Sequence, residues 1–215
     1  MNTLSEQAPG SGQGLWQWLL RSIGLESWFQ QAPTEARTNQ EERVFLRLAL
    51  PADKQHPAGE QASFLAKALS DCATALRAGG SEVISHKGGT LLLSWPAAAT
   101  AQATLVLNTF FQLSEALQRH GYQGPSLCGA ASLGWAAASQ NGSQRRYRGE
   151  VVSSVAGIVH EAERLGGGLF IAAALHYQVA LHTPFEYELH VGFKVPGHRY
   201  PATLYRVKAA PAAKI

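Results

Sequence analysis

Residues 147–172 read YRGEVVSSVAGIVHEAERLGGGLFIA, and this stretch decides the fold. Apolar residues recur at helical spacing from 150 to 165, which predicts an amphipathic helix. Three glycines at 166–168 follow directly, and glycine commonly ends a helix. The run LFIA at 169–172 then predicts a short strand. This passage from helix to strand indicates a protein in which helices pack on a sheet.

The segments on either side predict further helices and strands in mixed order. The expected helices are 60–78, 97–120 and 150–165. The expected strands are 43–50, 82–86, 90–95, 126–136, 144–148, 169–172, 185–191 and 202–207. Gly88-Gly89 and Asn141-Gly142 mark two turns between strands. The order β-α-β-β-α-β with appended elements predicts an α+β fold: a ferredoxin-like core with extra strands, and helices on one face of a single antiparallel-rich sheet.

The predicted main domain, 43–208, is preceded by three segments of different character. Residues 1–13 are polar and rich in Gly and Ser, which predicts a disordered tail. Residues 14–31 place Trp and Leu at helical spacing and predict an amphipathic helix that packs on its own domain or on a second copy. The alternative is peripheral contact with a membrane surface, although the segment holds only one basic residue, Arg21. Residues 32–42 resemble a linker, and 209–215 a tail.

The composition limits the chemistry. The chain has 215 residues, of which 46% are hydrophobic and only 15% charged, with a net charge of +3. That balance is too weakly basic for a nucleic-acid-binding protein. Of the fifteen acidic residues only Asp53 and Asp71 are aspartates. This shortage disfavours sites built from clustered aspartates, including most Mg²⁺ sites.

Cysteine usage and hydropathy indicate the compartment. Cys72 and Cys128 are too few for a disulfide framework and are expected to be reduced and buried. No apolar run approaches the roughly 18 residues that a membrane span needs. The N-terminus also lacks the pattern of a signal peptide. We therefore expect a cytoplasmic protein.

Five segments in order carry a family resemblance. They are VFLRLALPAD (44–53), VISHKGGTLLLSW (83–95), AASLGWA (130–136), the quoted stretch 147–172, and VPGHRYPATLYRV (195–207). In this order and spacing the chain resembles the class III adenylate/guanylate cyclase catalytic domain over about residues 43–208. The resemblance implies a two-metal phosphoryl-transfer site at a homodimer interface, built from two aspartates.

The positions that the resemblance assigns to this chemistry hold other residues. The two metal-binding aspartates would lie at Arg47 and Gly89. The ribose-orienting asparagine would lie at Ser153 and the transition-state arginine at Gly157, although a small slip of the alignment would assign that arginine to Arg164. The base-reading residue would lie near Arg146. A guanidinium repels a divalent cation, and glycine offers no ligand. We therefore expect a pseudoenzyme without a metal cofactor.

Because Arg47 and Gly89 stand where the resemblance would place aspartates, we expect a basic cleft that binds an anionic ligand without metal. ATP is the first candidate nucleotide. Arginine can replace Mg²⁺ as the counter-charge of phosphate, and backbone amides of residues 48–52, except Pro51, would cradle it. The predicted nucleotide-binding residues are Arg47, Leu48, Ala52, Lys87, Gly89, Thr90, Arg145, Arg146, Arg148 and Ser153.

Three alternatives remain open at this stage. In the first, these arginines have a purely structural role: those of 144–148 form a solvated surface, and Arg47 pairs with Glu82 or Glu150. In the second, the domain is a ligand-free module that pairs with itself or with another signalling protein. A residually active cyclase is the third alternative.

Overall fold

The structure, a computed structural model, describes residues 39–97, 100–141, 144–195 and 201–209. The tail and helix expected at 1–13 and 14–31 lie outside the described residues, as does nearly all of the C-terminal tail. Residues 39–42, which the sequence placed in a linker, form the beginning of the first strand.

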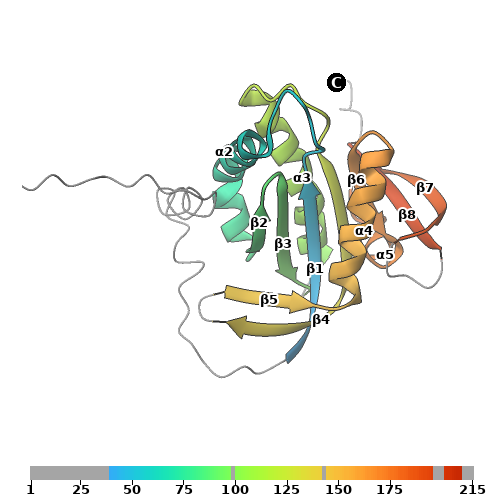
Figure 1. The fold of residues 1–215 in the computed structure, drawn as a ribbon. Helices are drawn as coiled ribbons and strands as arrows, with labels where there is room; N and C mark the ends of the chain where they lie inside the picture. Colours follow the sequence, from blue (N-terminus) through green and yellow to red (C-terminus); the bar gives the residue numbers. More distant parts are fainter. Residues whose placement is uncertain (1–38, 98–99, 142–143, 196–200, 210–215) are drawn as a thin grey trace, which may run out of the picture.

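Within the described residues, eight strands form one sheet in the order β2-β3-β1-β4-β6-β8-β7, with β5 paired to β4 alone (Figure 1). The strands are β1 (Asn39–Ala49), β2 (Glu82–Lys87), β3 (Thr90–Pro96), β4 (Cys128–Asn141), β5 (Gln144–Arg148), β6 (Gly168–Ala172), β7 (Glu186–Phe193) and β8 (Ala202–Lys208). Only β4 and β6 pair in parallel, and every other pairing is antiparallel. The expected α+β fold with an antiparallel-rich sheet is confirmed.

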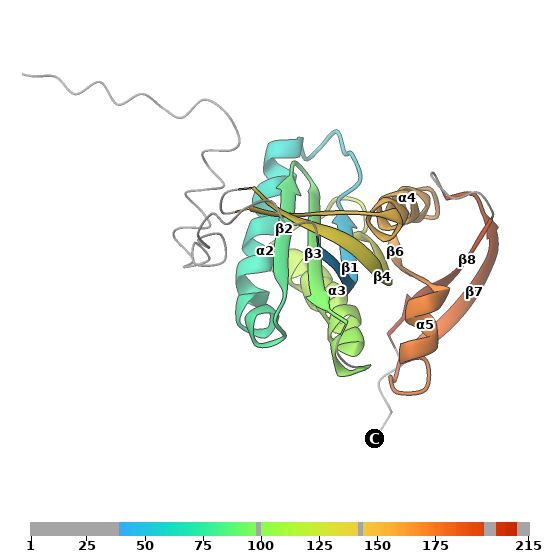
Figure 2. The ribbon, with the colours of Figure 1, turned by 90° about the horizontal axis from the view of Figure 1, so that it is seen from below.

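The helices lie on both faces of this sheet, so the expectation of one helical face was wrong (Figure 2). The helices are α2 (Ala58–Ala78), α3 (Thr100–Arg119), α4 (Glu150–Arg164) and α5 (Ala173–Val179). Side chains of α2, α3 and α5 share one core with the sheet, whereas α4 packs Val155 and Ile158 with Phe45 and Phe170 on the opposite face. The reason is the parallel step from β4 to β6, whose crossover contains α4 and carries it over the other side.

The end of one strand and one short helix differ from the sequence prediction. β4 continues to Asn141, five residues past its expected end, because it pairs with β5 over Ala137–Asn141. The alanines there carry little of the alternating hydrophobicity that identifies a strand. The seven-residue helix α5 was not predicted. The helix end expected at the glycines 166–168 is confirmed, since Gly166 adopts a φ angle of +82° after α4. Gly80, with a φ angle of +68°, follows α2 in the same way.

Strand β1 lies inside the sheet, and its side chains point alternately into the cores on the two faces. Its even-numbered residues Val44, Leu46 and Leu48 belong to the core beneath α2 and α3. Its odd-numbered residues Phe45 and Ala49 belong to the core beneath α4. Successive side chains of a strand point to opposite faces, so Arg43 and Arg47 project from the α4 face. Both central arginines therefore lie on the same side of the sheet.

Two sequence-based expectations about the rest of the chain can be compared with the structure. Cys72 and Cys128 are both free and buried, as predicted. Burial raises the pKa of Cys128 to about 12, so this thiol stays protonated and unreactive. Among the described residues, no helix is long and apolar enough to cross a membrane.

Candidate functional site

Arg47 lies in the middle of β1, on the α4 face of the sheet. Its cross-strand neighbours are Leu92 on β3 and Ala130 on β4, both buried and apolar. The side chain of Arg47 is half-buried, and it has neither an ion pair nor a hydrogen bond with any other described residue. The structural ion pair with Glu82 or Glu150 that the sequence offered as an alternative is therefore not formed. The guanidinium of Arg47 therefore has no acidic partner among the described residues.

Lys87 shares this face with Arg47. The register pairs Lys87 with Thr90, and Thr90 with Ala49, two residues beyond Arg47 on β1. Paired residues of an antiparallel sheet project from the same face, so the two cations and Thr90 lie on one surface. Lys87 is exposed, and the Thr90 hydroxyl donates a 2.8 Å hydrogen bond to its carbonyl oxygen, which closes the hairpin.

Gly89 occupies a tight position beside the loop that follows β1. The amide of Leu50 donates a 2.8 Å hydrogen bond to the Gly89 carbonyl. A Cβ atom added to Gly89 would lie 2.7 Å from Oε1 of Gln61 and 3.2 Å from the Leu50 carbonyl oxygen. Gln61 is buried and donates from Nε2 to the Pro51 carbonyl at 2.8 Å, so it is held in this space. Gln61 thus fills the place where a side chain of residue 89 would begin.

A divalent metal pair does not fit the residues at these two positions. Mg²⁺ requires oxygen ligands, typically carboxylates. Arg47 supplies a positive charge, Gly89 supplies no side chain, and Gln61 crowds the space beside it.

The loop after β1 is closed by its own side chains. His56 Nδ1 lies 2.8 Å from Asp53 Oδ2, and the Gln55 amide donates to Asp53 Oδ1 at 3.1 Å. The His56 ring packs against Phe64 and Tyr122, with ring centroids 5.9 and 5.1 Å away. The hydrogen bonds from His56 and from the Gln55 amide lower the pKa of Asp53. The side chains of Asp53 and His56 thereby hold the loop in one conformation.

This closure reduces the number of backbone amides available to a phosphate. Leu48 lies within β1 between β3 and β4, so its peptide group belongs to the sheet ladder. The Leu50 amide is bonded to Gly89, and Pro51 has no amide hydrogen. Of the loop predicted to cradle phosphate, Ala52 is exposed and its amide has no hydrogen bond among the described residues.

A second arginine on the same strand pairs with two carboxylates. Arg43, only 4% exposed, donates from Nε to the Ser94 hydroxyl at 2.8 Å. Its Nη1 and Nη2 atoms lie 3.2 Å from Glu41 and 3.2 Å from Glu82, and its guanidinium lies 5.0 Å from the centre of the Tyr147 ring. We call the polar group that it joins the Arg43 cluster, which consists of Glu41, Arg43, Glu82, Ser94, Arg145 and Tyr147.

The Arg43 cluster ties the β4–β5 hairpin to β2. Arg145 forms ion pairs with Glu41 and with Glu82, the latter at 3.2 Å. The Tyr147 hydroxyl donates to Glu82 Oε2 at 3.0 Å. Burial, reinforced by the Glu82 charge, raises the pKa of Tyr147, which keeps the hydroxyl protonated as a donor. Four strands, β1, β2, β3 and β5, are thus joined through one polar group.

The structure separates the arginines that the sequence grouped into a cleft. Arg145 pairs with Gln140 and faces the Arg43 cluster, where both of its ion pairs are made. Arg146 and Arg148 are exposed. Because strand residues alternate, their side chains project from the face opposite to Tyr147. Ser153 is exposed in the first turn of α4, and its amide donates to the Gly149 carbonyl at 3.2 Å.

Sequence reasoning missed Arg43 and identified the wrong partner for Glu82. The alternation of β1 could have placed Glu41, Arg43 and Arg47 on one face, which was the available signal. The pairing of Glu82 with Arg43 and Arg145 depends on the order of β2, β3 and β1 and on the hairpin that returns over β2. Those contacts join residues far apart in sequence, so no local pattern indicates them.

Comparison with known proteins identifies the fold. No protein-family model matches the chain, and no curated protein matches it either. Solved structures match well. The adenylyl cyclase CyaB from P. aeruginosa is 12% identical with a TM-score of 0.65, over 82% of this chain and 98% of that one. A bacterial light-regulated adenylyl cyclase is 15% identical with a TM-score of 0.67, over 91% of this chain and 64% of that one.

A third structure extends the likeness to guanylate cyclases. The guanylate cyclase domain of RhGC from Catenaria anguillulae, in complex with GTP, is 14% identical with a TM-score of 0.57, over 80% of this chain and 100% of that one. The chain therefore has the fold of a class III cyclase catalytic domain, as the resemblance predicted. At this level of identity the likeness establishes the fold and not the activity.

Proposed function

We propose that this protein is a catalytically silent member of the cyclase fold that binds a nucleotide without metal, in a regulatory or signalling role. ATP is the first candidate ligand. One observation carries the proposal. Arg47, at the position that the resemblance assigns to a metal-binding aspartate, is half-buried between apolar neighbours and has no acidic partner among the described residues.

The electrostatics of Arg47 favour an anionic ligand. A partly buried charge costs free energy unless it is paired. A phosphate would supply the missing charge, and a guanidinium binds phosphate oxygens through two parallel hydrogen bonds. Lys87, on the same face, would add a second positive charge. In this proposal Arg47 and Lys87 take the place of metal ions as the counter-charge.

Two solved structures with the same fold support a nucleotide as the ligand. One is the catalytic core of a rhodopsin-guanylyl cyclase with converted specificity, in complex with ATPαS, and the other is the RhGC domain in complex with GTP. Their ligands make nucleoside triphosphates the first compounds to test here. Fewer residues are proposed to contact the ligand than the sequence suggested. Arg145 already has two acidic partners, and the exposed Arg146 and Arg148 project from the face of β5 opposite to Tyr147.

The proposal that the protein does not cyclise nucleotides rests on the same positions. A cyclase reaction needs strong stabilisation of negative charge on the reacting phosphate, commonly by metal ions. Arg47 and Gly89 offer no carboxylate, and Gln61 fills the space beside Gly89. We therefore expect no cyclic nucleotide from ATP or GTP with Mg²⁺ or Mn²⁺. Formation of cyclic AMP with Mn²⁺ would overturn the proposed silence.

A thermal-shift experiment tests nucleotide binding. The full chain is melted in EDTA with and without millimolar ATP, alongside the variants Arg47→Ala and Arg119→Ala. Arg119 is a matched control because it is exposed at the end of α3, across the sheet, and pairs with Asp71. We expect ATP to raise the melting temperature of the wild type and of Arg119→Ala, and not of Arg47→Ala. An equal shift for all three proteins would contradict the role of Arg47.

A second candidate function is a ligand-free interaction module built on the cyclase fold. The observation that favours it is the closed loop after β1, where Gln61, the Leu50–Gly89 hydrogen bond and the Asp53–His56 pair occupy much of the space near the expected phosphate position. This candidate predicts no thermal shift with any nucleotide, together with tight self-association or binding of another signalling protein.

A further inference from the structure

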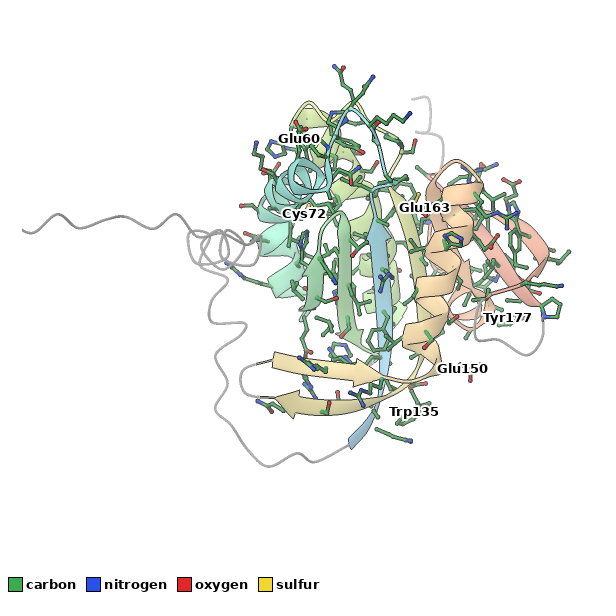
Figure 3. The ribbon with its side chains drawn as sticks, in the orientation of Figure 1. Glu60, Cys72, Trp135, Glu150, Glu163 and Tyr177 are labelled. Carbon is green, nitrogen blue, oxygen red and sulfur yellow. The ribbon has the colours of Figure 1, made fainter. Side chains whose placement is uncertain are left out.

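Exposed apolar side chains gather at one end of the sheet, around α5 and β7. Six large hydrophobic residues are exposed in the described chain, and four of them lie here. Leu189 and Val191 on β7 are 58% and 69% exposed, while Tyr177 on α5 and Leu181 just after it are 77% and 89% exposed. Figure 3 places Tyr177 at the opposite end of the molecule from Cys72 on α2. We call these four residues the β7 patch.

A stack of rings links two members of the β7 patch, Tyr177 and Leu189. The rings of His176 and Tyr205 are parallel with centroids 3.5 Å apart, and the Tyr177 ring lies 6.0 Å from His176. Leu189 is the cross-strand neighbour of Tyr205. These contacts join α5 to β7 across β8. Contiguous exposed apolar surface of this kind marks an interaction site more often than scattered single residues do.

β7 is also a strand with one open edge. It is the last strand in the sheet order, and among the described residues it pairs only with β8 (Figure 1). Glu186–His190 pairs regularly with β8, and the register shifts only after His190, near Gly192. An edge strand offers unpaired backbone groups to another strand, and exposed apolar residues on it favour that pairing. The open edge and the apolar residues therefore point to the same kind of partner, a further β-strand.

We propose that β7 pairs with β7 of a second copy of this chain, antiparallel and centred on Leu189, so that the two sheets become one. In this register Leu189 lies opposite Leu189 of the second copy, and Tyr187 lies opposite Val191. Within its own chain Glu188 pairs with Lys208 at 2.8 Å through Oε2, and its Oε1 lies 3.5 Å from His190 Nε2. In the proposed register Glu188 also lies opposite His190 of the second copy, whose ring can donate a hydrogen bond to the carboxylate. In this register apolar residues face apolar residues, and each carboxylate faces an imidazole.

Neighbouring registers are less favourable. A twofold axis through the sheet preserves its faces, so the centre must fall on a residue and not between two residues. Centring the pair on Glu188 would set two carboxylates directly opposite each other, which destabilises a strand pair. Centring it on His190 would set Glu188 against Gly192 and extend the pairing past the register shift. The register centred on Leu189 sets no like charges opposite each other and keeps the Leu189–Leu189 and Glu188–His190 pairs within the regular segment that ends at His190.

This interface is separate from the proposed nucleotide site. β1, which carries Arg47, lies four strands from β7 in the sheet order, which corresponds to about 19 Å at the usual strand spacing. The same twofold axis places both α5 helices, with their exposed Tyr177 and Leu181, on one face of the joined sheet. Pairing through β7 therefore does not require the nucleotide proposal to be correct.

Cysteine cross-linking tests the register directly. Opposite residues of an antiparallel pair have Cα atoms about 4.5 to 5.5 Å apart, within reach of a disulfide. Leu189→Cys should therefore form a covalent dimer under mild oxidation, seen on a non-reducing gel. Val191→Cys is the matched control, since it is equally exposed, but its two copies would lie about 14 Å apart. The native cysteines are both buried. A monomeric Leu189→Cys band, or equal cross-linking of both variants, would overturn the proposal.

Sedimentation of the full chain supplies a second measurement. Leu189→Lys removes apolar contact and sets two like charges at the centre of the interface, so self-association should weaken at least about tenfold. Leu165→Lys is the control, because Leu165 is exposed at the end of α4, outside the β7 patch. We expect Leu165→Lys to sediment as the wild type does. A wild type that stays monomeric, or a Leu189→Lys variant that associates as strongly as the wild type, would contradict β7 pairing.

Discussion

Arg43 and Arg47 lie four residues apart on the same strand and project from the same face, yet their surroundings are opposite. Arg43 is buried, forms ion pairs with Glu41 and Glu82, donates to the Ser94 hydroxyl and lies over the ring of Tyr147. Arg47 is half-buried among apolar neighbours and has no acidic partner among the described residues. One arginine is thus held by polar contacts within the fold, whereas the other makes no ion pair or hydrogen bond with any described residue.

The largest expected effect separates the two arginines by stability. Arg43→Ala leaves Glu41 and Glu82 short of a buried partner and should lower the free energy of unfolding by about 3 kcal/mol. Arg47→Ala removes no ion pair and should change it by less than about 0.5 kcal/mol. Urea denaturation of both variants measures the difference. Equal destabilisation by the two substitutions would contradict the claim that Arg43 stabilises the fold and Arg47 does not.

Gly89→Asp tests whether the second metal position can be rebuilt. The new Cβ would meet Gln61 and the Leu50 carbonyl, so we expect destabilisation of about 2 kcal/mol. Adding Gln61→Ala should relieve the contact, so that the double variant loses less than the sum of the two single losses. Strictly additive losses in the double-mutant cycle would show that Gln61 does not restrict this position.

Tyr147→Phe should have a smaller effect on the Arg43 cluster. It removes the hydroxyl that donates to Glu82, and a hydrogen bond to a charged group contributes about 1.5 kcal/mol. Glu82 keeps Arg43 and Arg145, so the fold should persist. Tyr177→Phe is the control, because the Tyr177 side chain is 77% exposed. Thermal or urea unfolding should show a loss of stability for Tyr147→Phe and none for Tyr177→Phe. A Tyr147→Phe variant as stable as the wild type would show that the hydroxyl is dispensable.

The smallest effect concerns the loop near Arg47 and depends on pH. The pKa of Asp53 is lowered in the folded chain, chiefly by its hydrogen bond from His56. Its stabilising contribution is therefore fully present above the ordinary value of 3.8, and it is lost as the pH falls through the lower folded value. Asp53→Asn should be less stable than the wild type at pH 6 and converge with it in stronger acid. A difference that stays constant with pH would exclude this linkage.

Much of the fold could be predicted because its signals are local. The apolar periodicity of 150–165 and the glycines after it identified α4 and β6, and the Gly88-Gly89 turn identified the β2–β3 hairpin. The face on which α4 packs was not predicted, because that depends on the parallel pairing of β4 with β6. The seven residues of α5 are too few for their periodicity to distinguish a helix from a loop.

The candidate site was predicted less completely, for a related reason. Arg47 and Gly89 could be selected because the resemblance assigns a role to each position. The prediction that Arg145, Arg146 and Arg148 line one cleft was wrong. Neighbouring side chains of β5 point to opposite faces, so Arg145 lies on one face and Arg146 and Arg148 lie on the other. The partners of Glu82 come from β1 and β5, whose approach is set by sheet order alone.

Calorimetric titration of ATP in the presence of EDTA tests the central claim most directly. The wild type should bind ATP without metal, and Arg47→Ala should bind at least about tenfold more weakly, because a charge-assisted contact to phosphate is lost. Arg119→Ala should bind as the wild type does. No heat from the wild type, or equal affinity for wild type and Arg47→Ala, would contradict the claim that Arg47 took over the phosphate-binding role of a metal.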